Sequence, residues 1–320
     1  MSILAAPITG LGWLGRQGTR AIAAVVLIAI AVPPVDAVLK PYVSEAIFAL
    51  LCIAFIRVDT AQLRGHLKRP GLVLAATAWT SLVIPALIGA ACLAFKVDTR
   101  APDLFLGLML QAIASPMMAA PAFAAVMGLD ATLVLTTLVV STALMPLTAP
   151  VFAYAFIGPA LTLSPLALGV KLFAILAGAL AVAAVVRYLV KLGTLLRYND
   201  QINGLNILIV FIFVAAVMED VAARFYAAPL MMISVTILTF VLSFAILGLT
   251  ALLFAAAGRD RAFVLGLMAS QRNMGLMLAA TSGALPALTW LYFALAQFPI
   301  YLSPLLLTSL GRRLKSGKQS

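Results

Sequence analysis

Charged residues are scarce in this chain: only 10% of its 320 residues are Asp, Glu, Lys or Arg, whereas 64% are hydrophobic. A soluble globular domain is close to half apolar and about a quarter charged. A chain with so little charge cannot cover the surface of a water-soluble globule. The sequence therefore excludes a soluble fold and predicts an all-α polytopic membrane protein.

The residue types that most often bind metals or perform catalysis are also few. His66 is the one histidine, and Cys52 and Cys92 lie inside apolar runs without a CxxC pattern. We interpret the two cysteines as small core residues, not as a disulfide or metal ligands. The sequence has no HExxH motif, no GxSxG motif with its partner residues and no Asp pair at membrane depth. We therefore expect no enzyme activity and no metal, and a sodium ion is the one cofactor left to consider.

The apolar residues gather in long runs, and the basic residues fall in the short loops between them. Ten membrane spans are predicted at about 21–35, 42–57, 71–95, 103–127, 131–157, 162–186, 202–219, 227–256, 262–283 and 287–310. The net charge of +11 therefore reports topology and does not indicate a nucleic-acid partner.

The distribution of Lys and Arg fixes the orientation. With both termini in the cytoplasm, fifteen of these residues lie inside and four outside, namely Lys40, Lys96, Arg100 and Arg224. This bias predicts a multi-pass protein of the cell (inner) membrane with both termini cytoplasmic. Arg16 and Arg20 before a short apolar run could also begin a signal peptide. A first span fits better, because its removal would break the even number of crossings.

Ten spans divide near Leu161 into two halves of five, residues 1–160 and 161–320. Because five is odd, the second half enters the membrane from the opposite side, as in the inverted repeats of secondary transporters. STALMPLTAP and AQFPIYLSP each carry a proline pair, with Pro150 and Pro304 separated by 154 residues. At nearly the same offset, SPMMAAP of span four matches SQRNMG of span nine.

These last two segments are predicted to interrupt their helices. Pro116 and Pro121 remove backbone donors from span four, and Gly275 with the polar residues 270–273 loosens span nine. In lipid such breaks persist only where they are buried in protein or line a wet cavity. The alternative is that both spans are ordinary packing helices with a kink.

Three patches resemble the bile acid:sodium symporter family: residues 61–95, where the loop LRGHLKRP leads into a span with Pro85; STALMPLTAPVF at 141–152; and the Asn-x-Gly from Asn273 to Gly275. The resemblance implies panel spans 1, 2, 6 and 7 and core spans 3–5 and 8–10, with spans four and nine broken and crossing. It also implies sodium-coupled uptake of organic anions. Arsenite-efflux relatives fit less well, because they typically use a Cys in span four and this chain has none there.

The sodium ligands that this resemblance implies are largely replaced. Where the family has a Glu and a Gln in span nine, this chain has Met268 and Arg272. The family's Ser-Asn pair in span four aligns with Ala119 and Ala120, and a Gln in span three aligns with Thr80. A sodium site needs several hard oxygen ligands. These replacements argue against sodium coupling.

Arg272 is the central candidate, because a guanidinium at mid-span is costly and usually faces a cavity or a partner. We hypothesise that it takes the place of the missing cation and donates to carbonyls where spans four and nine cross. Two alternatives stay open. Arg272 could form an ion pair with Glu45, Glu219 or Asp220, or it could bind the carboxylate or sulfonate of a substrate directly.

Further polar residues are candidates for substrate or ion binding near the same point. They are Asn273, Gln271, Ser270, Thr80, Ser115, Gln111 and Gln297. The predicted function is secondary transport of an organic anion, either bile-acid-like or a small carboxylate or sulfonate, with that anion and the lipid bilayer as partners. Sodium-coupled symport is the alternative within the family, and a channel or sensor is the alternative of another class. The oligomeric state stays open.

Overall fold

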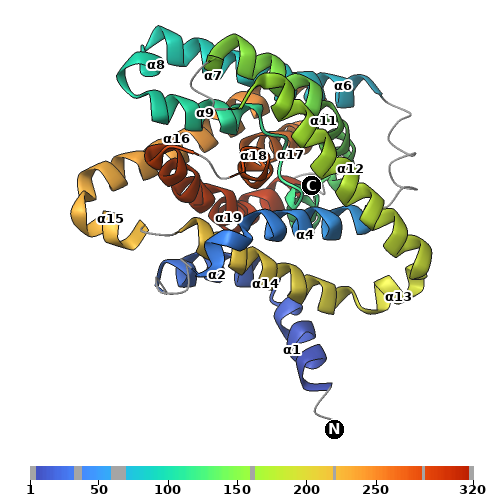
Figure 1. Cartoon of the computed structure of the whole chain (residues 1–320). Helices are drawn as coiled ribbons and strands as arrows, with labels where there is room; N and C mark the ends of the chain where they lie inside the picture. The colour runs from blue at the N-terminus through green and yellow to red at the C-terminus, as the bar shows by residue number, and fades with distance from the viewer. Residues whose placement is uncertain are drawn as a thin grey trace. The chain divides into compact units, whose positions relative to one another are not determined.

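The computed structural model of the chain describes residues 5–31, 38–58, 70–158, 163–218, 221–282 and 285–316. All regular elements in these ranges are helices (Figure 1). Helices satisfy their backbone hydrogen bonds internally, which a lipid environment requires. The prediction of an all-α membrane protein is therefore confirmed for the described part of the chain.

Six helices among the described residues are long and apolar enough to cross a membrane. They are Pro70–Ala94, Ala131–Ile157, Pro165–Leu189, Asn199–Ala227, Pro229–Leu253 and Ala287–Thr308. Two shorter apolar helices, Arg20–Ala29 and Pro102–Ile113, fall within the predicted first and fourth spans. The number of ten crossings therefore stays a prediction. His66, Glu219 and Asp220 lie outside the described residues.

The chain divides into two compact units, which we describe separately. Unit 1 comprises residues 1–58 and 175–232, and unit 2 comprises residues 59–174 and 233–320. The elements of unit 1 are α1 (Ala5–Arg16), α2 (Thr19–Ala31), η1 (Lys40–Tyr42), α4 (Val43–Ile56), the end of α12 (Pro165–Leu189), α13 (Leu192–Arg197), α14 (Asn199–Val217) and α15 (Val221–Ala227). In this unit, α14 packs against α1, α2 and α4.

The helix α1 was not expected, because the first predicted span begins at about residue 21. It packs closely against α14 through glycines: a Cβ on Gly15 would lie 1.9 Å from the Asp200 carbonyl oxygen, and one on Gly204 would lie 2.0 Å from that of Leu11. Arg16 also lies 3.7 Å from the Asp200 carboxylate. Small residues at this contact let the two backbones approach each other.

Unit 2 contains the predicted site. Its elements are α6 (Pro70–Ala78), η2 (Trp79–Val83), α7 (Ile84–Ala94), α8 (Val97–Arg100), α9 (Pro102–Ile113), α10 (Ala120–Val126), α11 (Ala131–Phe152), η3 (Ala153–Ile157), the start of α12, most of α16 (Pro229–Leu253), η5 (Ala255–Ala257), α17 (Arg259–Ser270), α18 (Met274–Ala280) and α19 (Ala287–Ser316). Proline opens α6, α9, α12 and α16, where its missing N–H costs no helical hydrogen bond.

Two pairs of helices in unit 2 have matching lengths. Both α9 and α17 have 12 residues, and both α10 and α18 have 7. The bounds of α18 are those of α10 shifted by 154 residues. The same shift relates Gly128 to Ser282, the residues with positive φ that follow these two short helices. It also separates Pro150 from Pro304.

Gly266 in α17 fixes how closely this helix approaches α16. A Cβ on Gly266 would lie 2.5 Å from the Leu247 carbonyl oxygen, whereas one on Gly248 would meet nothing within 4 Å. We expect Gly266→Ala to lower the free energy of unfolding by about 1–3 kcal/mol, the usual range for overpacking. Gly248→Ala should be neutral or slightly stabilising, because Ala favours a helix. Thermal melts of the purified variants in detergent check this difference, and equal melting temperatures would contradict it.

Candidate functional site

Two helices of unit 2 are interrupted in the middle of a predicted span. The first break lies between α9 and α10, and it begins at Ala114, which has extended backbone angles. The second lies between α17 and α18, and it begins at Gln271, which is also extended. Each break therefore leaves unpaired backbone groups that must find partners outside their own helix.

The backbone groups left unpaired at the two breaks form hydrogen bonds with each other. Pro116 and Arg272 pair in a short antiparallel bridge. The Met117 N–H donates to the Gln271 carbonyl at 2.8 Å, and the Asn273 N–H donates to the Ser115 carbonyl at 2.7 Å. The segments that link these half-helices thus cross as a two-stranded ribbon, which is hereafter called the crossing (residues 114–119 and 271–273).

Pro121 and Gly275 do not lie in the breaks, contrary to the sequence-based assignment. Each is the second residue of a half-helix, Pro121 in α10 and Gly275 in α18. Proline is tolerated there because the first N–H groups of a helix have no intrahelical acceptor. Of the three residues expected to interrupt helices, Pro116 alone lies at the crossing.

Arg272 is the largest fully buried side chain in the described part of the protein, with 1% of its surface exposed. Its Nη2 group donates two hydrogen bonds, to the Thr80 carbonyl at 2.7 Å and to the Ala112 carbonyl at 2.6 Å. Both acceptors are backbone oxygens. The guanidinium therefore joins three segments that are distant in sequence.

The Thr80 carbonyl is available because its helix changes register. Residues Trp79–Val83 form a π-helical turn, and the Ile84 N–H donates to the Trp79 carbonyl, five residues back. In this register the Thr80 carbonyl would accept from residue 85. Residue 85 is proline, which has no N–H. Arg272 supplies the donor that Pro85 lacks.

The Ala112 carbonyl is available for a related reason. It lies in the last turn of α9, where it would accept from the N–H of residue 116 if the helix continued. Residue 116 is proline, and the helix ends at Ile113. Two prolines thus leave two carbonyls without helical donors, and one arginine Nη2 group binds both.

The two other nitrogens of the guanidinium make no hydrogen bond to the described residues. In the part of the chain that the structure describes, Nε and Nη1 of Arg272 have no hydrogen-bond partner. No ion pair of Arg272 is found among the described residues. The suggested partners Glu219 and Asp220 lie outside those residues, and Glu45 belongs to unit 1. Carbonyl oxygens satisfy hydrogen bonds, but they carry no net charge to cancel that of the arginine.

The crossing has two different faces. Side chains alternate along an extended segment, and directly opposed residues of an antiparallel pair share a face. The bridge therefore places Arg272 and Pro116 on one face, and Ser115, Gln271 and Asn273 on the other. Asn273 is partly exposed, whereas Arg272, Gln271 and Ser115 are buried.

The accessible face combines an amide with apolar side chains. The Asn273 Oδ1 accepts from the Leu276 N–H at 3.2 Å and caps α18. The two N–H groups of this amide have no partner in the described part of the chain and could donate to a ligand. Met117 and Met118 are partly exposed in the facing break. Methionine adapts its shape to irregular apolar ligands. Ser115 and Gln271 lie on the same face but are buried, and the Ser115 Oγ and both amide atoms of Gln271 have no partner among the described residues.

The side chains of the other predicted site residues that follow form hydrogen bonds within unit 2. Tyr292 donates to the Gln111 Oε1, the Gln297 Nε2 donates to the Phe293 carbonyl at 2.9 Å, and the Ser270 Oγ donates to the Leu267 carbonyl at 2.9 Å. The Thr80 Oγ1 donates within its own helix and lies 3.2 Å from the Ser141 Oγ. The contribution of Thr80 to the arginine site therefore comes from its carbonyl.

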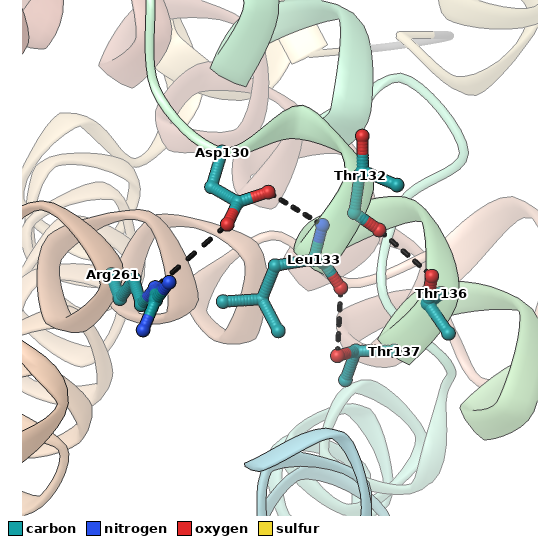
Figure 2. Close-up of polar contacts among 6 residues, drawn as sticks. All are labelled: Asp130, Thr132, Leu133, Thr136, Thr137 and Arg261. Carbon is teal, nitrogen blue, oxygen red and sulfur yellow. Dashed lines mark hydrogen bonds and ion pairs between the residues drawn. The ribbon is translucent and has the colours of Figure 1, made fainter. Parts of the chain in front are cut away.

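Asp130 links the start of α11 to α17, which sequence reasoning did not anticipate. One carboxylate oxygen accepts from the Leu133 N–H at 2.9 Å, and the other lies 3.8 Å from the Arg261 Nε (Figure 2). At the start of α9, the Thr289 hydroxyl donates to the Asp103 carbonyl at 2.6 Å. Both half-helices that lead into the crossing are thus tied at their outer ends to another helix of unit 2.

Thr136 and Thr137 are buried polar residues of α11. Figure 2 shows that each hydroxyl bonds within its own helix, to the carbonyls of Thr132 and Leu133 respectively. These hydrogen bonds occupy the donors, and the hydroxyl oxygens keep acceptor capacity only. The residues therefore offer little to an anion.

No family model matches the chain, and no curated protein is significantly similar to it in sequence. The fold and the site together define an all-α membrane protein in which two interrupted helices cross beside a buried arginine.

Proposed function

We propose that the chain is a secondary transporter that moves an organic anion by alternating access. The observation that carries this proposal is the crossing of two interrupted helices beside buried polar groups. Interrupted backbone in a membrane is tolerated where it is buried in protein or lines a path for a solute. In secondary transporters such discontinuous helices form the substrate and ion sites.

An inverted repeat of five spans per half, with ten in total, accounts for the matching elements. The helix pairs α9–α10 and α17–α18 have equal lengths and meet at their breaks. The division into two units supports a panel built from spans 1, 2, 6 and 7 and a core built from the others. The proposed location is the inner membrane, with both termini cytoplasmic, from the distribution of Lys and Arg.

Arg272 takes the place of a bound cation in this proposal. Its Nη2 group binds two backbone carbonyls that have lost their helical donors, as a cation would. A guanidinium suits this role better than an ammonium, because its planar donors reach several acceptors in fixed directions. Transport should then proceed without sodium.

Uptake into proteoliposomes tests this function. The full chain is reconstituted and given labelled pyruvate, benzoate or taurocholate, with sodium or choline outside at equal ionic strength. We expect saturable uptake of at least one anion, at the same rate in both salts. Uptake that requires sodium would show a true symporter and would refute the role of Arg272 as a cation. Flux without saturation or counterflow would identify a channel, and no flux of any of the three anions would refute the proposed function.

A further inference from the structure

We infer that the charge of Arg272 is neutralised by the transported anion, and that the protein is therefore an exchanger of monovalent anions. This inference rests on the proposed function and deepens it. It concerns the charge of the substrate and the mode of transport, which follow from the charge balance at the crossing.

Arg272 places a positive charge in the interior of unit 2. Arg272 is 1% exposed, and its Nη2 group binds only backbone carbonyls. Its Nε and Nη1 groups have no partner in the described part of the chain. A fixed positive charge in a low-dielectric interior favours an anion nearby, and the effect extends over several ångströms.

An anion can bind at Asn273, on the face of the crossing opposite Arg272. The alternation of side chains places Arg272 and Asn273 on opposite faces of the same short ribbon, in consecutive positions. Asn273 is partly exposed, and its amide N–H groups have no hydrogen-bond partner among the described residues. A ligand at Asn273 therefore experiences the field of Arg272 without touching it. Arg272 is accordingly a residue that selects the charge of the ligand, and Asn273 is the residue that contacts it.

The net charge at the crossing affects the energy of the conformational change that moves the anion across the membrane. A net charge is costly to carry through a low-dielectric barrier, whereas a neutral assembly is not. The crossing is positive when empty and neutral with one monovalent anion bound. The loaded protein should therefore change conformation faster than the empty one. Fast loaded steps and slow empty steps produce exchange. A bound dianion would leave the crossing with one net negative charge, and a neutral analogue would leave it with one net positive charge, so neither should be translocated fast.

Counterflow with the wild-type protein is the first measurement. Proteoliposomes are loaded with unlabelled benzoate or with impermeant gluconate, and the uptake of labelled benzoate is followed. We expect uptake at least about tenfold faster into benzoate-loaded vesicles, and an exchange rate independent of a potassium diffusion potential set with valinomycin. In competition, benzamide, which has a similar shape and no charge, should inhibit at least about tenfold less well than benzoate.

Variants at Arg272 provide the second measurement. Arg272→Gln should reduce the preference for benzoate over benzamide, and Arg272→Lys should keep it. A purely structural role would alter the rate in both variants without changing this preference. Arg100→Gln is the matched control, because Arg100 is an exposed arginine of α8 in the same unit.

The outcomes separate the two proposals. Equal uptake into the two kinds of vesicle, or equal inhibition by benzoate and benzamide, would overturn the exchange mechanism and leave a transporter in place. Wild-type data decide these points even if the variants do not fold. Absence of uptake and of counterflow for pyruvate, benzoate and taurocholate would refute the proposed function, and the exchange mechanism would fall with it.

Discussion

Replacement of Arg272 by methionine is expected to abolish transport and to lower the free energy of unfolding by about 2–4 kcal/mol. The variant leaves the Thr80 and Ala112 carbonyls buried without donors. Each unsatisfied buried group costs about 1–3 kcal/mol. In the observed helical register, no N–H can replace the guanidinium, because Pro85 and Pro116 stand where the donors would be.

A second effect of the Arg272→Met substitution opposes this loss of stability. Removal of a buried charge relieves a cost of about 2.5–3.5 kcal/mol on insertion scales. Only part of this relief applies, because in the membrane-inserted, unfolded chain the arginine can extend toward the interface or find water. The loss of two hydrogen bonds should therefore dominate.

Unfolding in mixed micelles, followed by titration with sodium dodecyl sulfate, measures this change. Arg272→Lys should lie between wild type and Arg272→Met, because it keeps the charge but loses the planar arrangement of donors. Arg100→Met should match the wild type, since Arg100 is exposed. Wild-type stability together with active transport in Arg272→Met would show that the arginine does not hold the crossing together.

The long apolar helices could be predicted from the sequence, because an 18-residue window of low charge is enough to identify them. The interruption of span nine could also be expected, since SQRNMG places four polar residues in an apolar run. The helix α1 could not, because its residues are too few to span a membrane and its partner α14 lies far along the chain.

The two carbonyls that accept hydrogen bonds from Arg272 could not be predicted from the sequence. Thr80 was chosen for its hydroxyl, yet its carbonyl is the group that binds the guanidinium. That carbonyl is free only because a π-helical turn ends one residue before Ile84 and is followed by Pro85. A one-residue change of helical register leaves no pattern in the hydrophobic residues. Likewise, Gln111 meets Tyr292, which is 181 residues away.

Pro85→Ala is expected to uncouple Thr80 from Arg272, although Pro85 makes no contact with the guanidinium among the hydrogen bonds described. The new N–H can donate to the Thr80 carbonyl in the π-helical register. If the turn relaxes to an α-helix, the Ile84 N–H takes that carbonyl. In either case Arg272 loses one of its two acceptors, and its guanidinium is held by the Ala112 carbonyl alone.

A double-mutant cycle tests this coupling. Arg272→Met in the Pro85→Ala background leaves one carbonyl without a donor, where the single variant leaves two. The arginine substitution should therefore cost about 1–3 kcal/mol less in that background, the value of one unsatisfied buried group. The corresponding cycle with Pro304→Ala should be additive within about 0.5 kcal/mol, because Pro304 lies inside α19 and frees no carbonyl that Arg272 binds. An additive cycle for Pro85 would mean that proline is not what makes the Thr80 carbonyl available. Coupling at Pro85 alone would instead show that the π-helical turn is part of the arginine site.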